Sequence, residues 1–362
     1  MSEITIATVT TSLLVVLGVS VLLNSITSKK EDLPVKLPVN VSKPLITFSS
    51  FYFKWKLFCT ALLRFVTEPH SPKYDEGIKA QSALFNDPEF VLVKTKTIYF
   101  IRHGQSVWNA SFSTFDNIFF VVLRIFRTIL FEFFLLSTND SLIYDSPLSL
   151  FGVSQCMDTA QLFSSVPPDS ELENDISILT GKSTKSTVLF SSYLRRAQST
   201  MILLLQSRLN STNENIFISH ELEELIRNPD TVTLYSSFGY ITFPLMEKLF
   251  SPQSFNKYQR LKMVEHDSPS LRRAYPKVKS FFNRLFTKVD EDVIIVCGHS
   301  RWIRYTLNVF FPKSSIDRDY TDKKISNCGI IKFDVQFKKK ETGEEFFVCD
   351  PKSLKIVNGG FA

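Results

Sequence analysis

The sequence predicts an α/β protein with three layers, in which helices cover both faces of a mostly parallel sheet, preceded by a transmembrane helix. The 362 residues are 44% hydrophobic and 22% charged, which is ordinary globular composition. Two short apolar runs, at residues 97–101 and 293–297, have the length and composition of buried strands. Residues 4–23 contain no charged side chain, and this run predicts the membrane-spanning segment.

The apolar run near the N-terminus is long enough to cross a bilayer. As a helix it would span about 30 Å, the thickness of the hydrocarbon layer. A cleaved signal peptide would begin with basic residues, whereas only Met-Ser-Glu precedes this run, so an uncleaved anchor is favoured. Lys29, Lys30 and Lys36 come after the run and no Lys or Arg precedes it. The positive-inside rule therefore predicts a single-pass membrane protein with its main domain in the cytosol.

The chain divides into three parts on this interpretation. Residues 1–27 form the anchor, residues 28–95 form a linker and an amphipathic, aromatic lead-in, and residues 96–362 form the main domain. Within the lead-in, residues 48–66 mix Phe, Tyr and Trp with Lys54, Lys56 and Arg64. A helix with this composition can lie in a membrane interface or pack on the next domain, and the sequence favours neither.

Charge and cysteine content exclude some classes of function. The net charge of +6 and the pI near 8.9 are too weak to indicate nucleic-acid binding. Five scattered cysteines show no metal-ligand spacing, so we expect reduced thiols, no disulfide framework and no metal. The 34 Phe residues predict a large core, a lipid-facing surface, or both.

Chemistry-bearing residues come directly after the first strand. Residues 97–101 end in Arg102-His103-Gly104, and Ser106 and Asn109 come shortly afterwards. The Arg-His-Gly triplet alone is a weak signal. Its place at the carboxyl end of a strand strengthens it, because open α/β sheets build their sites there.

Four later segments extend the pattern. In chain order they are Asp145-Ser-Pro-Leu with Gly152 and Gln155, a strand followed by Arg196-Ala, Leu222-Glu223-Glu224, and a strand followed by Gly298-His299. Together with the first motif, these segments resemble the histidine phosphatase superfamily, in its phosphoglycerate mutase-like branch. The resemblance covers roughly residues 97–307. It implies the three-layer phosphoglycerate mutase-like fold and a reaction that requires no cofactor or metal.

The resemblance assigns His103 as the nucleophile that takes the phosphoryl group onto a ring nitrogen. Phosphoryl transfer needs charge stabilisation around three oxygens, and guanidinium groups match two such oxygens at once. Arg102, Arg196 and Asn109 are therefore the phosphate-binding residues that the resemblance implies. The two arginines would also disfavour the imidazolium form of His103, which keeps its nitrogen nucleophilic. Taken without the resemblance, Asn109 could instead be a turn or helix residue.

The remaining catalytic assignments are His299 and Glu224. His299 would donate a hydrogen bond to the transferred group. Glu224 would protonate the leaving oxygen and then activate water, which requires a carboxyl of raised pKa in an enclosed site. Glu221 and Glu223 are adjacent, so a solvated acidic surface is the alternative interpretation. Arg195, Arg301 and Arg304 could widen a basic mouth or simply be surface charges.

An apolar insertion at residues 111–144 departs from the family pattern. Its centre, residues 118–136, contains only three charged side chains. Arg124, Arg127, Thr128 and Glu132 share one helical face, so the segment predicts an amphipathic helix and not a second membrane span. Such a helix can lie in the membrane interface, which we favour slightly, or can pack into the domain as a lid.

A second departure concerns the reaction. Phosphoglycerate mutases carry Arg-His-Tyr-Gly after their acid segment, whereas Glu224 is followed by Leu-Ile-Arg-Asn-Pro. Hydrolysis is therefore expected in place of mutase activity. The sequence predicts a membrane-tethered phosphatase that acts through phosphohistidine on a phosphorylated small molecule or lipid. The alternatives are a phosphoglycerate mutase-type phosphotransferase and a membrane-bound pseudoenzyme that binds phosphorylated ligands.

Overall fold

The computed structural model describes residues 48–67, 72–85, 87–112, 118–138, 140–167, 169–212, 214–234, 245–258, 273–312 and 316–362. The anchor predicted at residues 1–27 and the first part of the linker lie outside these residues. Among the helices that are described, none is long and apolar enough to cross a membrane.

The core of the molecule is one six-stranded sheet. Its strands are β1 (Val91–Arg102), β2 (Thr187–Ser192), β3 (Ile216–Ser219), β4 (Val293–Gly298), β5 (Ile330–Lys339) and β6 (Glu345–Asn358). The spatial order is β3-β2-β4-β1-β5-β6. The first four strands are parallel, whereas β5 runs antiparallel to β1, and β6 runs antiparallel to β5. The α/β class is confirmed, and the sheet is more mixed than predicted because the β5–β6 hairpin extends it.

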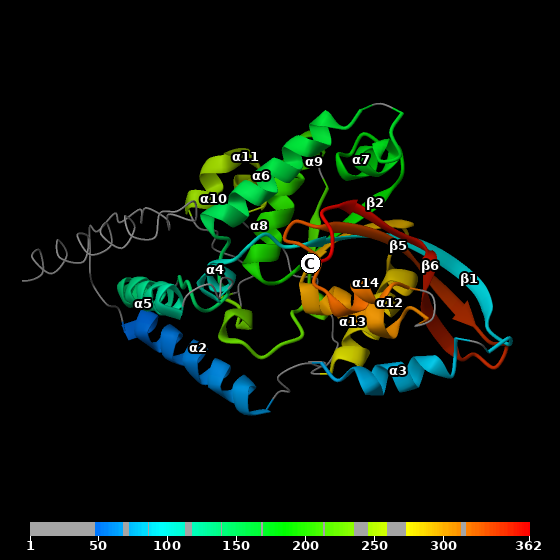
Figure 1. The fold of residues 1–362 in the computed structure, drawn as a ribbon, viewed down its shortest axis with the longest axis horizontal. Coiled ribbons are helices and arrows are strands. Elements are labelled where there is room, and N and C mark those ends of the chain that lie inside the picture. The colour runs from blue at the N-terminus through cyan, green and yellow to red at the C-terminus, as the bar shows by residue number, and fades with distance from the viewer. Residues whose placement is uncertain are drawn as a thin grey trace, which may run out of the picture.

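Helices cover both faces of the sheet (Figure 1). Alternation along β1 sends Tyr99 and Ile101 into one core and Ile98 and Phe100 into the other. The first core is covered by α6 (Leu150–Ser165), α7 (Glu173–Leu179), α8 (Arg195–Leu204), α9 (Gln206–Ser211) and α11 (Pro252–Tyr258). The second is covered by α3 (Tyr74–Ser82), α12 (Ala274–Lys288) and α13 (Ser300–Val309). The three layers that the sequence predicts are present.

Shorter elements complete the described chain. They are α4 (Val107–Phe112), η1 (Leu135–Ser137), η2 (His220–Leu222), η3 (Pro229–Thr231), α10 (Leu245–Phe250) and α14 (Arg318–Asp322). All five cysteines are free, as predicted.

Two helices lie beside each other at the end of the molecule away from the β5–β6 hairpin (Figure 1). They are α2 (Phe48–Thr67), from the lead-in, and α5 (Ile118–Phe134), from the insertion. One charged residue of each helix faces inward: Lys54 of α2 and Glu132 of α5 are buried and form an ion pair 2.7 Å long. Glu132 also accepts a hydrogen bond from the backbone N–H of Leu142 at 2.8 Å.

The apolar residues of the same two helices face outward. On α5 they form a stripe at helical spacing, of Phe119, Val122, Phe126, Ile129 and Phe133, each between 54% and 66% exposed. On α2 the exposed set is Tyr52, Trp55, Phe58, Leu62, Leu63, Phe65 and Val66. We call these two sets the α2–α5 apolar face. A lid would bury the apolar side of the insertion helix, whereas these apolar side chains are exposed on α5.

Candidate active site

The carboxyl ends of β1 and β4 bring the two predicted histidines together. These parallel strands pair up to Arg102 opposite Gly298, so His103 and His299 come next at the same edge of the sheet. Their rings lie 5.0 Å apart, centroid to centroid, at an interplanar angle of 61°. Both side chains are buried. The strand-end placement inferred from the sequence is therefore correct.

Hydrogen bonding fixes which nitrogen of His103 is available. Nδ1 lies 2.6 Å from the carbonyl oxygen of Gly104. Because a carbonyl oxygen only accepts, Nδ1 must carry the proton, and Nε2 keeps its lone pair. Burial lowers the pKa of His103 well below its ordinary value, and Arg196 and Arg102 lower it further. His103 is thus a neutral imidazole with a nucleophilic Nε2.

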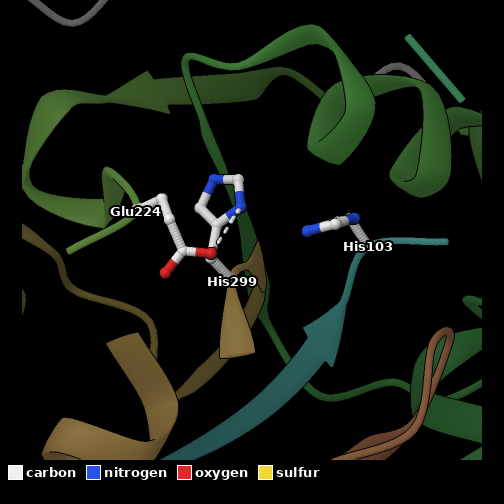
Figure 2. A group of neighbouring side chains, drawn as sticks. All are labelled: His103, Glu224 and His299. Carbon is white, nitrogen blue, oxygen red and sulfur yellow. Dashed lines mark ion pairs between the residues drawn. The ribbon is translucent and has the colours of Figure 1, made fainter. Parts of the chain in front are cut away.

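His299 and Glu224 complete the cluster, and the ring of His299 lies between Glu224 and His103 (Figure 2). Nε2 of His299 lies 2.8 Å from Oγ of Ser192, at the end of β2. Nδ1 of His299 lies 3.8 Å from Oε2 of Glu224 and has no hydrogen-bond partner in the described residues. Burial raises the pKa of Glu224, although Arg196 opposes this effect. The carboxyl therefore favours its protonated form more than a solvated glutamate does.

The two predicted phosphate-binding arginines flank this cluster. Nη1 of Arg196 donates to the carbonyl of Asp230 at 2.8 Å and lies 3.3 Å from the carboxylate of the same residue. Nη1 of Arg102 donates to the carbonyl of Ile325. The Nε atoms of both arginines are buried and lack partners in the described part of the chain. Buried donors without partners are uncommon, and an anionic oxygen would satisfy them.

The structure separates the three adjacent glutamates. Glu221 is buried against Arg284, and its carboxylate also accepts a hydrogen bond from Ser280. Burial raises the pKa of Glu223, but Lys277 and Arg64 outweigh it and lower this pKa to about 2. Only Glu224 of the three lines the central cavity. The solvated acidic surface considered for this segment is absent, because all three carboxylates are largely buried.

The cavity has a volume of about 420 Å³ and is lined by every predicted site residue except His299, which is adjacent to His103 and Glu224. Asn109 lines it from α4, whose first turn is capped by Oγ of Ser106 accepting the Asn109 N–H at 3.1 Å. Sequence reasoning missed several lining residues, namely Gln105, Trp108, Ile226, Asn228, Asp230, Ser300, Lys324 and Asn327. The lining residues outside the matched motifs belong to no sequence pattern, so the sequence could not have assigned them to the cavity.

Three motif residues have structural roles. Arg195 is completely buried, and its backbone N–H donates to Oδ1 of Asp145 at 2.9 Å. Its guanidinium also pairs with Asp140 at 2.6 Å, so Arg195 does not widen the mouth of the cavity. Gly104 and Gly152 bring two motifs into backbone contact: a Cβ on Gly152 would lie 2.0 Å from the carbonyl oxygen of Gln105.

His103, Glu224 and His299 could in principle approach one metal ion, because their ligand atoms lie within 4.8 Å of one another. The charges around them fit a metal poorly. Arg102 and Arg196 lower the pKa of both histidines, and the same repulsion acts on a divalent cation. The same two cations suit a phosphoryl group. This arrangement gives no basis for a metal step.

Comparison with known proteins gives a match in structure only. No family model and no curated protein matches the chain. A phosphoserine phosphatase from Entamoeba histolytica is 14% identical, with 73% of this chain and 96% of that chain covered and a TM-score of 0.33. An ecdysone phosphate phosphatase from Bombix mori is 11% identical (71% and 93% covered, TM-score 0.35). A phosphoglycerate mutase from Bacillus anthracis is also 11% identical (71% and 93% covered, TM-score 0.33).

These solved structures are histidine phosphatases and phosphoglycerate mutase-like proteins, the superfamily that the sequence motifs resemble. Identities of 11–14% and TM-scores below 0.5 are too low to carry an argument about what this chain does. The class of the molecule is therefore stated from its own residues. It is a mixed α/β protein in which a neutral histidine, two guanidinium groups and a buried carboxyl line one cavity, with a second neutral histidine adjacent to them.

Proposed function

We propose that the chain is a phosphomonoester phosphatase that acts through a phosphohistidine intermediate. The observation that carries the proposal is the state of His103. Its imidazole is neutral, its Nδ1 is held by the carbonyl of Gly104, and guanidinium groups from two different elements adjoin it. A neutral nucleophile surrounded by cations suits attack on a phosphate dianion.

The reaction has two displacements. In the first, Nε2 of His103 attacks phosphorus, the bond from phosphorus to the ester oxygen breaks, and Glu224 gives its proton to the leaving oxygen. In the second, the Glu224 carboxylate takes a proton from water, and the water oxygen attacks phosphorus. The N–P bond then breaks, and inorganic phosphate and neutral His103 are restored. Arg102, Arg196, Asn109 and His299 would hold the phosphoryl oxygens in both steps.

Water is the proposed acceptor because of the residues that come after Glu224. Ile226, Asn228 and Asp230 line the cavity where a phosphoglycerate mutase carries its basic Arg-His-Tyr-Gly stretch. No cation of this segment reaches the cavity in the described residues, so the intermediate would meet water more readily than a second phosphorylated substrate. A mutase and a binding-only pseudoenzyme remain as outcomes of the experiment on His103.

The proposal is tested with His103→Ala and a matched control, His220→Ala, which changes a histidine outside the cavity. We expect His103→Ala to lose para-nitrophenyl phosphate hydrolysis by about 10⁴-fold or more, as is usual for a covalent nucleophile. It should also lose the acid-labile, base-stable phosphoenzyme that the wild type forms, while His220→Ala keeps both. Full activity in His103→Ala would overturn the mechanism. A phosphoenzyme that transfers to phosphoglycerate faster than to water would favour the mutase, and ligand binding without turnover in the wild type would favour the pseudoenzyme.

We further propose that this phosphatase works at the cytosolic surface of a membrane. The uncharged run at residues 4–23 is the first support. The α2–α5 apolar face is the second, because both helices expose many large apolar side chains while Lys54 and Glu132 are buried between them. Trp55 and Tyr52 belong to this face, and such amphipathic aromatics are enriched where protein meets the lipid headgroups. Only 24 residues separate the run from the start of α2, which keeps the face near the bilayer.

A lipid-binding test shows whether the α2–α5 apolar face binds a membrane or a second copy of the chain. Protein lacking residues 1–27 should leave the integral-membrane fraction but bind phosphatidylcholine–phosphatidylserine vesicles reversibly. The triple variant Phe126→Ser, Ile129→Ser, Phe133→Ser should bind them much more weakly and keep phosphatase activity. Leu162→Ser, Leu249→Ser, Phe250→Ser changes three equally exposed apolar residues elsewhere and should bind normally. A dimer that dissociates in the first triple variant, or a truncated protein that ignores vesicles, would contradict a lipid occupant.

A further inference from the structure

The carboxyl of Glu224 is held in place mainly by the backbone that carries it. Within the described residues, its side chain accepts a hydrogen bond only from the backbone N–H of Leu225, the next residue, at 3.3 Å. Nδ1 of His299 lies 3.8 Å away, which is too far for a hydrogen bond. Glu224 lies between η2 and η3, outside any helix or strand. The direction of its carboxyl therefore depends on what holds residues 223–231, which we call the acid segment.

One guanidinium group from the lead-in helix holds both ends of the acid segment. Nη2 of Arg64, on α2, forms an ion pair with Oε1 of Glu223. Nη1 of the same side chain donates to the carbonyl oxygen of Thr231 at 3.0 Å. The side chains of Arg64 and Glu223 are only 18% and 13% exposed, so this ion pair is largely shielded from water. Because a guanidinium presents its N–H groups in a rigid fork, it fixes the separation of the two ends.

A second contact joins the same two parts of the chain in the opposite direction. Arg227, in the acid segment, donates from Nη1 to the carbonyl oxygen of Phe65 on α2 at 2.5 Å. Its guanidinium carbon also lies 4.5 Å from the centre of the Phe65 ring. The C-terminal end of α2 is therefore attached to the acid segment at both ends and in the middle.

Two other side chains bind Glu223, but neither holds both ends of the acid segment at once. Nζ of Lys277, on α12, pairs with the Glu223 carboxylate at 2.6 Å, and in the described part of the chain it pairs with no other carboxylate. The hydroxyl of Tyr193 donates to the same carboxylate at 2.6 Å and lies 3.4 Å from the carbonyl of Thr231. A hydroxyl has one proton, so it can donate to only one of these acceptors at a time, whereas Arg64 donates to both.

We propose that Arg64 is a positioning residue for Glu224: by fixing both ends of the acid segment, it directs the Glu224 carboxyl toward the leaving oxygen. The inference rests on the proposed function, because it concerns the acid of that reaction. Arg64 acts through Glu224 and does not itself line the cavity. The catalytic unit therefore includes α2 and begins before residue 96, where the sequence placed its start.

Two substrates with different leaving groups test this role. Para-nitrophenyl phosphate releases a stabilised phenolate that needs little help from an acid, whereas propyl phosphate releases an alkoxide that must be protonated. In the full-length protein, Arg64→Met should lower kcat/KM for propyl phosphate by about 10- to 100-fold, the effect of a small misplacement of a catalytic group. The loss for para-nitrophenyl phosphate should be about tenfold smaller. Partial unfolding would lower both values equally, so their ratio reports the position of the acid.

Three further variants complete the experiment. Arg64→Lys keeps the charge but loses the fork, so it should recover only part of the activity. Lys56→Met removes an exposed cation from the same helix and should behave as the wild type. Glu224→Gln should show the same dependence on the leaving group, with a larger loss. Adding Arg64→Met to Glu224→Gln should change kcat/KM for propyl phosphate by less than about threefold, because the carboxyl that Arg64 positions is already gone.

The outcomes separate this role of Arg64 from the proposed function itself. If Arg64→Met slows both substrates equally or changes neither, or if its effect is the same with and without Glu224, Arg64 does not position the acid and the phosphatase stands. If Glu224→Gln shows no dependence on the leaving group, Glu224 is not the acid and the proposed mechanism is wrong. Hydrolysis that survives His103→Ala would overturn the phosphohistidine route altogether.

Discussion

The active-site edge of the sheet and the α2–α5 pair bury their polar residues for different reasons. At the sheet edge, buried histidines, arginines and Glu224 surround a cavity, and several of their donors have no partner in the described residues. In the α2–α5 pair, Lys54 and Glu132 are buried against each other and against backbone groups. The first arrangement is poised for an external ligand, whereas the second satisfies itself. Buried charged groups without partners therefore distinguish the candidate site from the ion pair between the two helices.

The largest predicted effect that tests this comparison is a loss of kcat/KM. Glu224→Gln should lower kcat/KM by about 10²- to 10⁴-fold, because general acid catalysis typically contributes that much. Activity of the wild type should fall as the pH rises through the raised pKa of Glu224, since the leaving oxygen needs its proton, and this limb should vanish in the variant. Glu221→Gln provides the control. A larger loss of activity in the stably folded control would move the acid to Glu221.

Next in size is the buried ion pair between the two helices. Lys54→Met leaves Glu132 buried without its cation, and we expect a loss of about 3–5 kcal/mol in the free energy of unfolding. Lys56→Met, two residues further along α2 on its exposed side, should cost less than about 0.5 kcal/mol. Urea titration followed by circular dichroism measures both. Equal midpoints would mean that α2 does not pack through Lys54.

A comparable loss is expected from the glycine contact at the site. Gly152→Ala places a Cβ against the backbone of Gln105, and backbone cannot move aside as a side-chain end can. We expect about 2–4 kcal/mol of destabilisation together with reduced activity, because Gln105 lies two residues from His103. Gly343→Ala is the comparison, since space is open there, although its φ of +91° carries its own strain. Thermal unfolding and hydrolysis rates, measured on the same samples, test whether the loss of stability and the loss of activity occur together in Gly152→Ala.

The smallest predicted effect concerns pH and stability. Burial raises the pKa of Glu247 to about 7, so the folded state holds a proton that the unfolded state has released above its ordinary pKa of 4.5. Stability should therefore fall as pH rises from about 4.5 to 7, by about 3 kcal/mol, and then level off on this account. Glu247→Gln should flatten that part of the profile. A profile unchanged by the substitution would show that another group is responsible.

The motifs predicted the site residues better than they predicted the surroundings of those residues. His103 and His299 could be paired because parallel strands deliver their ends to one edge, a rule that needs no side-chain detail. Lys324 and Asn327 could not be placed, because they lie beyond the matched motifs, in the segment between α14 and β5 that no motif signalled. Periodicity correctly grouped Thr128 and Glu132 on one face of the insertion helix. It could not tell which face turns inward, because an amphipathic pattern is the same whether water, lipid or protein meets its apolar side.

Two backbone hydrogen bonds join the chain before the insertion to the chain after it. The backbone N–H of Val107 donates to Pro147 at 2.9 Å, and that of Ser149 donates to Gln105 at the same distance. The segment between them leaves and returns through these two hydrogen bonds, so a change of length that keeps its ion pairs with Lys54 and Arg195 adds only the entropy of closing a longer loop. Doubling such a loop costs only about 0.6 kcal/mol. The segment that carries α5 can therefore be lengthened, shortened or replaced by another membrane-binding element, while β1, the strand that presents His103, keeps its place.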